Sequence, residues 1–141
     1  MIEEVTIDLV ERPGPDLVRT IEAGLDAYNA ATAGAQNPAP FALVMKNDCG
    51  EIVGGLFAVT FWSGLAIELL WVAEAYRGAG YGRTLLTRAE AEGHRRGAKK
   101  AFLNTHTFQA PGFYEKLGYE LYGELRDFPP GYDRRYYVKT L

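Results

Sequence analysis

The chain has 141 residues, enough for one compact domain with a hydrophobic core of its own. Its 48% hydrophobic and 23% charged residues exclude a disordered chain, and no apolar run approaches the roughly 18 residues of a membrane-spanning helix. The net charge is −3, yet residues 77–100 carry 7 basic and 2 acidic side chains, whereas residues 1–76 carry 3 basic and 11 acidic ones. In an acidic chain, so narrow a basic block does not favour nucleic-acid binding.

The first part of the chain is predicted to form a strand, a helix and a loop. Apolar and polar side chains alternate over residues 2–10 as in a strand, and apolar side chains recur at helical spacing over residues 13–28. Residues 29–40 are rich in Ala, Asn, Gly and Pro and are expected to form a loop. Residues 1–4 lack the basic-then-apolar pattern of a signal peptide, so we expect a cytoplasmic protein.

Three strands joined by tight turns are expected next. Residues 41–46 and 52–62 form a hairpin around the turn 47–51, and residues 65–72 make a third strand. The single cysteine, Cys49, falls in the hairpin turn. We interpret it as a turn residue and not as a nucleophile, because no histidine is near it in the sequence.

The rest of the chain alternates between helices and strands. We expect a helix, a strand, a short helix and two further strands, over residues 83–97, 101–105, 111–117, 119–125 and 135–139. Neither an internal repeat nor an interdomain linker is visible. The sequence therefore predicts one domain over residues 1–141, of mixed α/β class.

The turn between the third strand and the second helix carries the clearest chemical signal. Gly78, Gly80 and Gly82 alternate with other residues between Arg77 and Arg83. A strand, a glycine-rich turn and a helix N-terminus together aim backbone N–H groups at a phosphate. The turn lacks the Gly-Lys-Ser/Thr ending of a P-loop and the G-x-G-x-x-G spacing of a dinucleotide-binding fold. These two nucleotide-binding classes therefore fit poorly.

Two motifs resemble those of the GNAT superfamily of N-acetyltransferases. RGAGYG, residues 77–82, matches the Arg/Gln-x-x-Gly-x-Gly/Ala motif that binds acyl-CoA, and APGFYEKLGY, residues 110–119, is similar to the A-x-x-x-Tyr-x-Lys-x-Gly-Phe/Tyr segment. The two motifs have the order and the distance found in that family. Residues 104–131 are also similar to a group of small bacterial members with a Phe-Gln-Ala and Asp-Phe-Pro ending.

The resemblance implies a GNAT-like fold and a cosubstrate. The fold is a central mixed, mostly antiparallel sheet of about seven strands, flanked by three to four helices and splayed between strands 4 and 5. The cosubstrate is acetyl-CoA, with no metal ion. The residues implied to hold it come from the glycine turn, the strand before it and the segments facing that strand: Leu70, Trp71, Val72, Arg77, Gly78, Ala79, Gly80, Tyr81, Gly82, Arg83, Asn104 and Phe113.

Within that set the resemblance implies separate roles. Backbone N–H groups from Arg77 through Arg83 cradle the pyrophosphate, the strand 70–72 pairs with the pantetheine arm, and the N–H of Val72 faces the oxyanion. Many members carry Asn seven residues before the tyrosine of the second motif, where this chain has Thr107; Asn104 and Gln109 are alternative sources of the amide. Phe113 is expected to lie in the core or beside the cosubstrate.

The reaction implied is direct transfer of an acetyl group to a primary amine. Tyr114 matches the tyrosine that acts as general acid toward the leaving thiolate. Two residues compete for the role of base. Glu68 is the only charge in residues 65–73, and strand alternation places it on the face shared by Leu70 and Val72; His106 follows the strand 101–105 and has an imidazole suited to proton transfer.

The acceptor and the partners are less sharply indicated. We expect a small-molecule or peptide amine, held by residues 28–40, Trp62 and the segment 126–137, and neither nucleic acid nor membrane as a partner. A homodimer formed through the C-terminal strands is common among relatives. The alternative hypothesis is a non-catalytic acyl-CoA-binding sensor or interaction module, which needs the glycine turn but neither Tyr114 nor a base.

Overall fold

The computed structural model describes residues 3–141 and divides the chain into two compact units, Met1–Gln36 and Asn37–Leu141. Each unit is described by itself, and the expectation of one domain over the whole chain stays a prediction. In the described residues, no helix combines the length and apolarity needed to cross a membrane.

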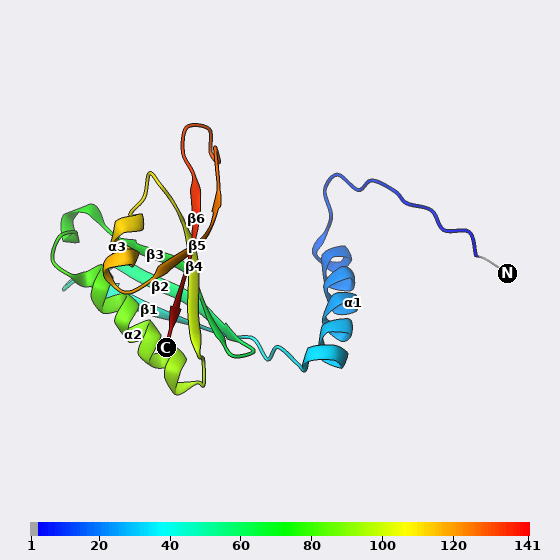
Figure 1. Ribbon diagram of the computed structural model, residues 1–141, viewed down its shortest axis with the longest axis horizontal. Helices are drawn as coiled ribbons and strands as arrows, with labels where there is room; N and C mark the ends of the chain where they lie inside the picture. The colour runs from blue at the N-terminus through cyan, green and yellow to red at the C-terminus, as the bar shows by residue number, and fades with distance from the viewer. Residues whose placement is uncertain (1–2) are drawn as a thin grey trace. The chain divides into compact units, whose positions relative to one another are not determined.

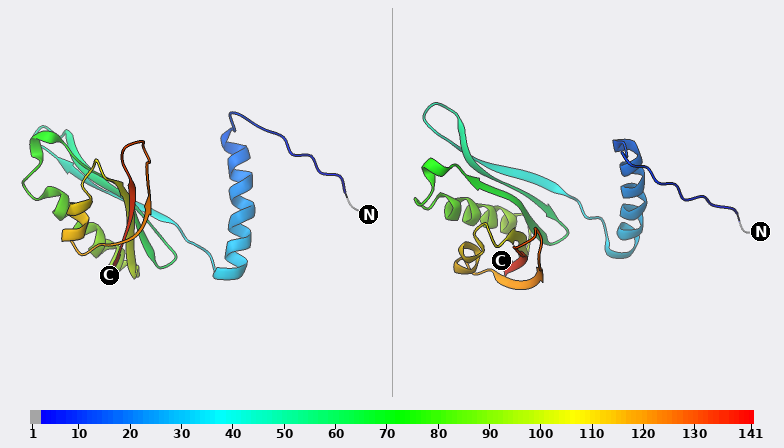
Figure 2. Two further views of the ribbon diagram at one scale, coloured as in Figure 1. Left: turned by 45° about the horizontal axis from the view of Figure 1, so that its top comes forward. Right: turned by 90° about the horizontal axis from the view of Figure 1, so that it is seen from above.

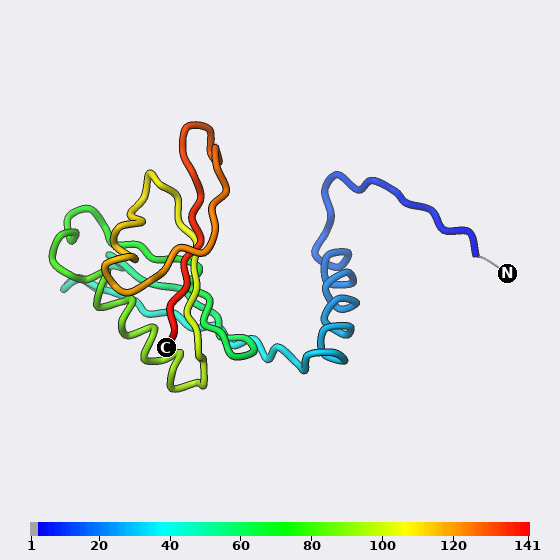
Figure 3. Tube along the Cα trace, in the orientation of Figure 1, coloured from blue at the N-terminus to red at the C-terminus, as the bar shows by residue number. Residues whose placement is uncertain are grey.

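The first unit contains one helix, α1 (Pro15–Ala33), which begins with a proline in its first turn and has no buried residue. The predicted helix is therefore confirmed, but it continues into residues 29–33, which the sequence predicted as loop. The predicted strand 2–10 is wrong over the described residues 3–10, which follow an extended path without regular structure (Figure 3). A strand needs a hydrogen-bonded neighbour, and residues 3–10 pair with none.

The second unit is built on a six-stranded sheet with the order β1-β2-β3-β4-β6-β5 (Figure 1). Its strands are β1 (Ala39–Lys46), β2 (Ile52–Phe61), β3 (Gly64–Val72), β4 (Lys100–His106), β5 (Glu120–Leu125) and β6 (Arg134–Thr140). All neighbours pair antiparallel except β3 and β4, which are parallel. The mixed, mostly antiparallel sheet is confirmed, with six strands where about seven were expected, because residues 3–10 add none.

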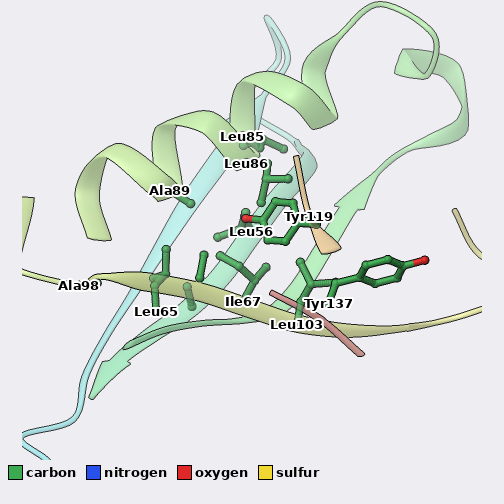
Figure 4. Close-up of a cluster of buried hydrophobic side chains, with 12 residues drawn as sticks. Leu56, Leu65, Ile67, Leu85, Leu86, Ala89, Ala98, Leu103, Tyr119 and Tyr137 are labelled. Atoms are coloured by element: carbon green, nitrogen blue, oxygen red, sulfur yellow. The ribbon is translucent and has the colours of Figure 1, made fainter. Parts of the chain in front are cut away.

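One long helix covers a face of this sheet. α2 (Tyr81–Arg95) follows the short 3-10 helix η1 (Glu74–Tyr76), and it packs on β2 and β3 (Figure 2). Its buried residues Leu85, Leu86 and Ala89 point toward the sheet (Figure 4). Together with buried side chains of β2, β3, β4 and β6 and of two residues outside the strands, they form the core: Leu56, Ala58, Leu65, Ile67, Ala101, Leu103 and Tyr137 from the strands, and Ala98 and Tyr119. The third helix, α3 (Pro111–Lys116), connects β4 to β5.

Close contact between α2 and β3 depends on Gly93. A Cβ atom added at this position would lie 2.7 Å from Cδ2 of Leu65, which is fully buried. We expect Gly93→Ala to lower the free energy of unfolding by about 1–3 kcal/mol, because the helix must move away from the sheet. Urea denaturation followed by circular dichroism measures the change. The control is Gly24→Ala in α1, where the added methyl meets no atom within 4 Å; equal stability of Gly93→Ala and the wild type would contradict the expectation.

The sheet opens between its two parallel strands, β3 and β4, which are the predicted strands 4 and 5 when residues 2–10 are counted as strand 1. β3 and β4 pair only through residues 64–66 and 100–102. Beyond these residues the two strands follow different directions (Figure 1). A β-bulge interrupts the other side of β3, where Phe57 is opposite Leu69 but Ala58 is opposite Ile67, which leaves Glu68 without a partner residue in β2.

Candidate active site

A cleft of about 940 Å³ opens where β3 and β4 part. It is lined by the second half of β3, the turn between β3 and α2, the end of β4, and α3 with the turn before it. Every residue predicted to bind the cosubstrate lines this cleft except Ala79. Of the three predicted catalytic residues, Tyr114 and Glu68 line it and His106 does not.

The glycine turn presents free backbone donors to the cleft. Gly78 and Gly80 have φ angles of 78° and 87°, a conformation that side chains disfavour, and a Cβ atom at either glycine would enter open space. No side chain caps α2, and its first backbone bond runs from Thr84 to the carbonyl of Gly80. Among the described residues, the N–H groups of residues 78–83 make no hydrogen bond, so those that face the cleft are free to bind an anion.

Arg77 joins the turn to the end of β3. Its Nε donates a hydrogen bond to the carbonyl of Val72, with a donor–acceptor distance of 2.9 Å. The guanidinium therefore lies where the strand ends and the glycine turn begins. This position adds positive charge to a site already favourable to anions because of the helix dipole of α2.

The second half of β3 has an open edge on the side of the cleft. The N–H of Ala73 bonds to Val53 in β2, and strand alternation then turns the N–H groups of Leu70 and Val72 away from β2. β4 no longer pairs with β3 at this level. These two backbone groups are therefore available to a ligand lying along the cleft.

The bulge corrects the predicted orientation of Glu68. Ile67 belongs to the buried core, while Leu70 and Val72 also pack against that core, so the alternation shifts by one residue between them. Glu68 is thus not on the face shared by Leu70 and Val72; its side chain is exposed and lines the cleft. Strand alternation read from the sequence could not show this, because the bulge depends on how β2 and β3 pair.

Tyr114 is held among aromatic rings at the opposite wall of the cleft. Its ring centroid lies 5.1 Å from Phe113, 5.9 Å from Tyr119 and 6.3 Å from Tyr137. Burial raises the pKa of the Tyr114 phenol above its usual value. The phenol is therefore protonated at neutral pH. Within residues 3–141 its hydroxyl makes no hydrogen bond, so it can donate one to a ligand in the cleft.

His106 is the last residue of β4, and its imidazole contacts the loop between β5 and β6. Its Nδ1 lies 3.2 Å from the carbonyl oxygen of Phe128, so the hydrogen bond is made by the tautomer with the proton on Nδ1. The ring also stacks on Phe108, with centroids 5.2 Å apart and planes 8° apart. These contacts place the imidazole beside the cleft wall and not in it.

The two candidate amides differ in how far they are already engaged. The side-chain oxygen of Gln109 accepts hydrogen bonds from the Thr105 hydroxyl and the His106 N–H, each at 2.9 Å, and so braces the turn before α3. The side-chain oxygen of Asn104 accepts one bond from Arg134 Nε at 2.8 Å. Both residues line the cleft, and their NH₂ groups remain available as donors.

Several lining residues were not singled out from the sequence. They are Ile67, Leu69, Tyr76, Leu103, Thr105, Phe108 and Ala110. Most are strand residues whose position at the cleft follows from the parting of β3 and β4. Phe108 had a usable signal, because a large apolar residue stands in the polar turn between a strand and the tyrosine motif. In the described part of the chain, no three His, Cys, Asp or Glu side chains gather as metal ligands.

Known proteins are similar to this chain in sequence and in architecture. The profile of the Acetyltransferase (GNAT) family matches residues 7–119. Blasticidin-S acetyltransferase of Streptomyces morookaense is 43% identical over 93 residues, 65% of this chain and 68% of that protein. An acetyltransferase of Agrobacterium fabrum is 34% identical over 113 residues, 80% of this chain and 82% of that protein. The crystal structure of an acetyltransferase from Bacillus cereus superposes with a TM-score of 0.87 at 32% identity, over 95% of this chain and 98% of that one. The chain belongs to the GNAT family of acetyltransferases.

Proposed function

We propose that this protein transfers the acetyl group of acetyl-CoA directly to a primary amine of a small molecule, with Tyr114 as general acid. One observation carries the proposal: a single cleft joins the free N–H groups of the glycine turn, the open edge of β3 and the Tyr114 hydroxyl. Acetyl-CoA carries phosphate groups at one end and a thioester at the other. The glycine turn can bind the phosphates, and the Tyr114 hydroxyl can donate a proton to the sulfur of the thioester.

The residues present fit acetyl-CoA by their donor chemistry. The N–H groups of residues 78–83 and the guanidinium of Arg77 suit the pyrophosphate, and open space at Gly78 and Gly80 lets it approach the backbone. The open edge of β3 suits the amide groups of the pantetheine arm, because these groups can pair with a strand as a neighbouring strand would. Phe113 and the NH₂ of Asn104 complete the lining.

The transfer requires a proton to leave the amine and another to reach the sulfur. An alkyl ammonium with a pKa of about 10 must be deprotonated before it attacks, and Glu68, exposed in the cleft, can accept this proton directly or through water. The amine nitrogen then bonds to the acetyl carbon, and a backbone N–H of β3 stabilises the oxyanion. As the carbon–sulfur bond breaks, Tyr114 protonates the sulfur, and the positively charged nitrogen of the tetrahedral intermediate loses its extra proton to the phenolate as it becomes the amide.

The relatives guide the choice of acceptor class. The Streptomyces morookaense relative is named for a compound, blasticidin-S, and supports a small molecule as the acceptor here. His106 can act as base only if the acceptor reaches outside the cleft lining, so Glu68 is the preferred candidate. Cytoplasmic location and homodimer formation stay predictions.

Calorimetric titration with acetyl-CoA tests the first half of the proposal. We expect micromolar binding that Gly80→Val weakens at least tenfold, because a branched side chain disfavours a φ of 87° and its methyl groups enter the space above the turn. The matched control is Gly50→Val, which has a similar φ of 79° in the turn between β1 and β2, outside the cleft. Equal weakening by both substitutions would contradict the assignment of the turn.

Release of free thiol in the presence of a panel of primary amines tests the second half. Amine-dependent release from acetyl-CoA, with mass spectrometry showing 42 Da added to the amine (the mass of an acetyl group less one hydrogen), supports the transferase. Binding of acetyl-CoA without thiol release across aromatic, aliphatic and peptide amines would instead favour the non-catalytic sensor.

A further inference from the structure

Four aromatic side chains form an exposed cluster beside the cleft. His106 stacks on Phe108, Tyr132 meets Phe108 edge to face with centroids 5.1 Å apart, and the Phe128 centroid lies 6.2 Å from that of His106. We call these four residues the aromatic shelf. Phe108, Phe128 and Tyr132 keep 53%, 47% and 48% of their surface exposed. Exposed apolar side chains that lie next to one another, and are not scattered singly, are typical of a ligand-binding surface.

The shelf is held rigid by hydrogen bonds between its two supporting segments. Thr107 and Asp133 bond twice: the Thr107 N–H to the Asp133 carbonyl at 2.9 Å, and the Asp133 N–H to the Thr107 hydroxyl at 3.0 Å. These bonds join the turn before α3 to the loop between β5 and β6. Thr107 stands where many family members carry Asn. In this structure its two hydrogen bonds attach the loop between β5 and β6 to the turn before α3.

The acidic side chains of the loop are also used internally. A carboxylate oxygen of Asp127 accepts the N–H of Gly131 at 2.8 Å, and one of Asp133 accepts the N–H of Asp127 at 3.0 Å. Phe128 and Tyr132 bond through their backbones at 2.7 Å. The loop is therefore ordered by its own polar groups and presents its rings outward, so a ligand need not order them on binding.

Phe108 connects the shelf to the reaction site. It lines the same cleft as Glu68, Asn104 and Tyr114. A molecule lying on the shelf can therefore extend a short chain into the cleft past Phe108. The carboxylate of Glu68, exposed in that cleft, favours a cationic group at the end of this chain.

We propose that the aromatic shelf selects acceptors in which a planar ring carries a primary amine on a short linker. The inference rests on the proposed acetyl transfer and names the class of its acceptor. The ring stacks against Phe108 and Tyr132 while the amine enters the cleft toward Glu68. Stacked or edge-to-face ring pairs are favoured beyond the area they bury, which gives a planar ring an advantage over a saturated one of the same size.

Two amines that differ only in their ring test this inference. 2-Phenylethylamine and 2-cyclohexylethylamine have the same linker and amine, and the cyclohexyl ring is the more hydrophobic. Their dissociation constants are measured by NMR titration of the protein without acetyl-CoA, so the result does not depend on turnover. We expect the phenyl compound to bind about three- to tenfold more tightly, a preference that reports stacking and not burial alone.

Variants assign the preference to the shelf. We expect Phe108→Leu to bring the two dissociation constants within about twofold of each other, since Leu retains apolar contact but not the ring. The control Tyr122→Leu removes an aromatic residue that is 59% exposed on β5, outside the shelf, and should leave the ratio unchanged. Equal binding of the two amines to the wild type, binding of neither, or a ratio that survives Phe108→Leu would overturn the inference. If the wild type binds the phenyl compound more tightly than the cyclohexyl compound, but releases no thiol from acetyl-CoA with any amine, the result would support the shelf and overturn the proposed acetyl transfer.

Discussion

Replacing Tyr114 with Phe is expected to lower kcat/KM for acetyl transfer at least 100-fold while acetyl-CoA affinity changes by less than about threefold. A positioned general acid contributes about 10²–10⁴-fold to the rate, and the substitution removes only the hydroxyl. The ring contacts with Phe113, Tyr119 and Tyr137 do not involve that oxygen, so the fold is preserved. Stopped-time assays of free thiol at several acetyl-CoA concentrations, with calorimetry for binding, measure the two quantities.

The raised pKa of Tyr114 also sets the expected pH dependence. Burial raises the pKa of the Tyr114 phenol above its ordinary value near 10.0, so the acid stays protonated throughout the range in which enzymes are assayed. The wild-type kcat should therefore show no loss from Tyr114 ionisation as pH rises from 7 to 9.5. Tyr122→Phe, which removes an exposed hydroxyl on β5, serves as the control and should retain full activity. Wild-type activity in Tyr114→Phe would exclude the phenol as the acid.

Replacing Lys139 with Met is expected to lower the free energy of unfolding by about 2–3 kcal/mol. Glu90 on α2 is only 9% exposed, and it accepts hydrogen bonds from Lys139 Nζ at 3.1 and 3.2 Å and from the Tyr119 hydroxyl at 2.7 Å. Removing the ammonium leaves a buried carboxylate without its counter-charge, which costs more than the ion pair itself contributes. The expected cost is placed below that of a fully buried pair because 27% of the Lys139 side chain is exposed.

A second substitution provides the decisive comparison for this buried network. The double variant Glu90→Gln with Lys139→Met should recover stability to within about 1 kcal/mol of the wild type, because the neutral amide still accepts from Tyr119 and no charge is left unpaired. The control is Arg19→Met, which breaks an exposed pair with Asp16 on α1 and should cost less than about 0.5 kcal/mol. Urea denaturation measures all three variants; a double variant no more stable than Lys139→Met would rule out the unpaired charge as the cause.

Burial and the Glu90 hydrogen bond also raise the pKa of Tyr119. Tyr119 contacts the Tyr114 ring, so the buried network supports the aromatic setting of the proposed acid. The network joins α2, β6 and the residue before β5, three elements far apart in the sequence. No local pattern indicated it, because its members become neighbours only when the sheet is assembled.

Local sequence signals were sufficient for most elements. Hydrophobic periodicity placed α1 and α2, and turn residues bounded β1, β2 and β3, because these signals depend on the residues of each element itself. The predicted strand over residues 3–10 was wrong because the signal is local. Alternation of apolar and polar side chains shows that a segment can form a strand, but not that a neighbouring strand is present to pair with it.

For the candidate site, the sequence by itself indicated the glycine turn through its glycines before a helix, and Tyr114 through its resemblance to the tyrosine of the second GNAT motif, because both lie in short contiguous stretches of the chain. Tertiary structure alone decided the rest. The bulge at Glu68 and the partial pairing of β3 with β4 set which groups face the cleft, and the bonds of Thr107 with Asp133 join two distant segments into the aromatic shelf. These features depend on strand register and on contacts between residues remote in sequence, and neither is encoded in any single stretch of the chain.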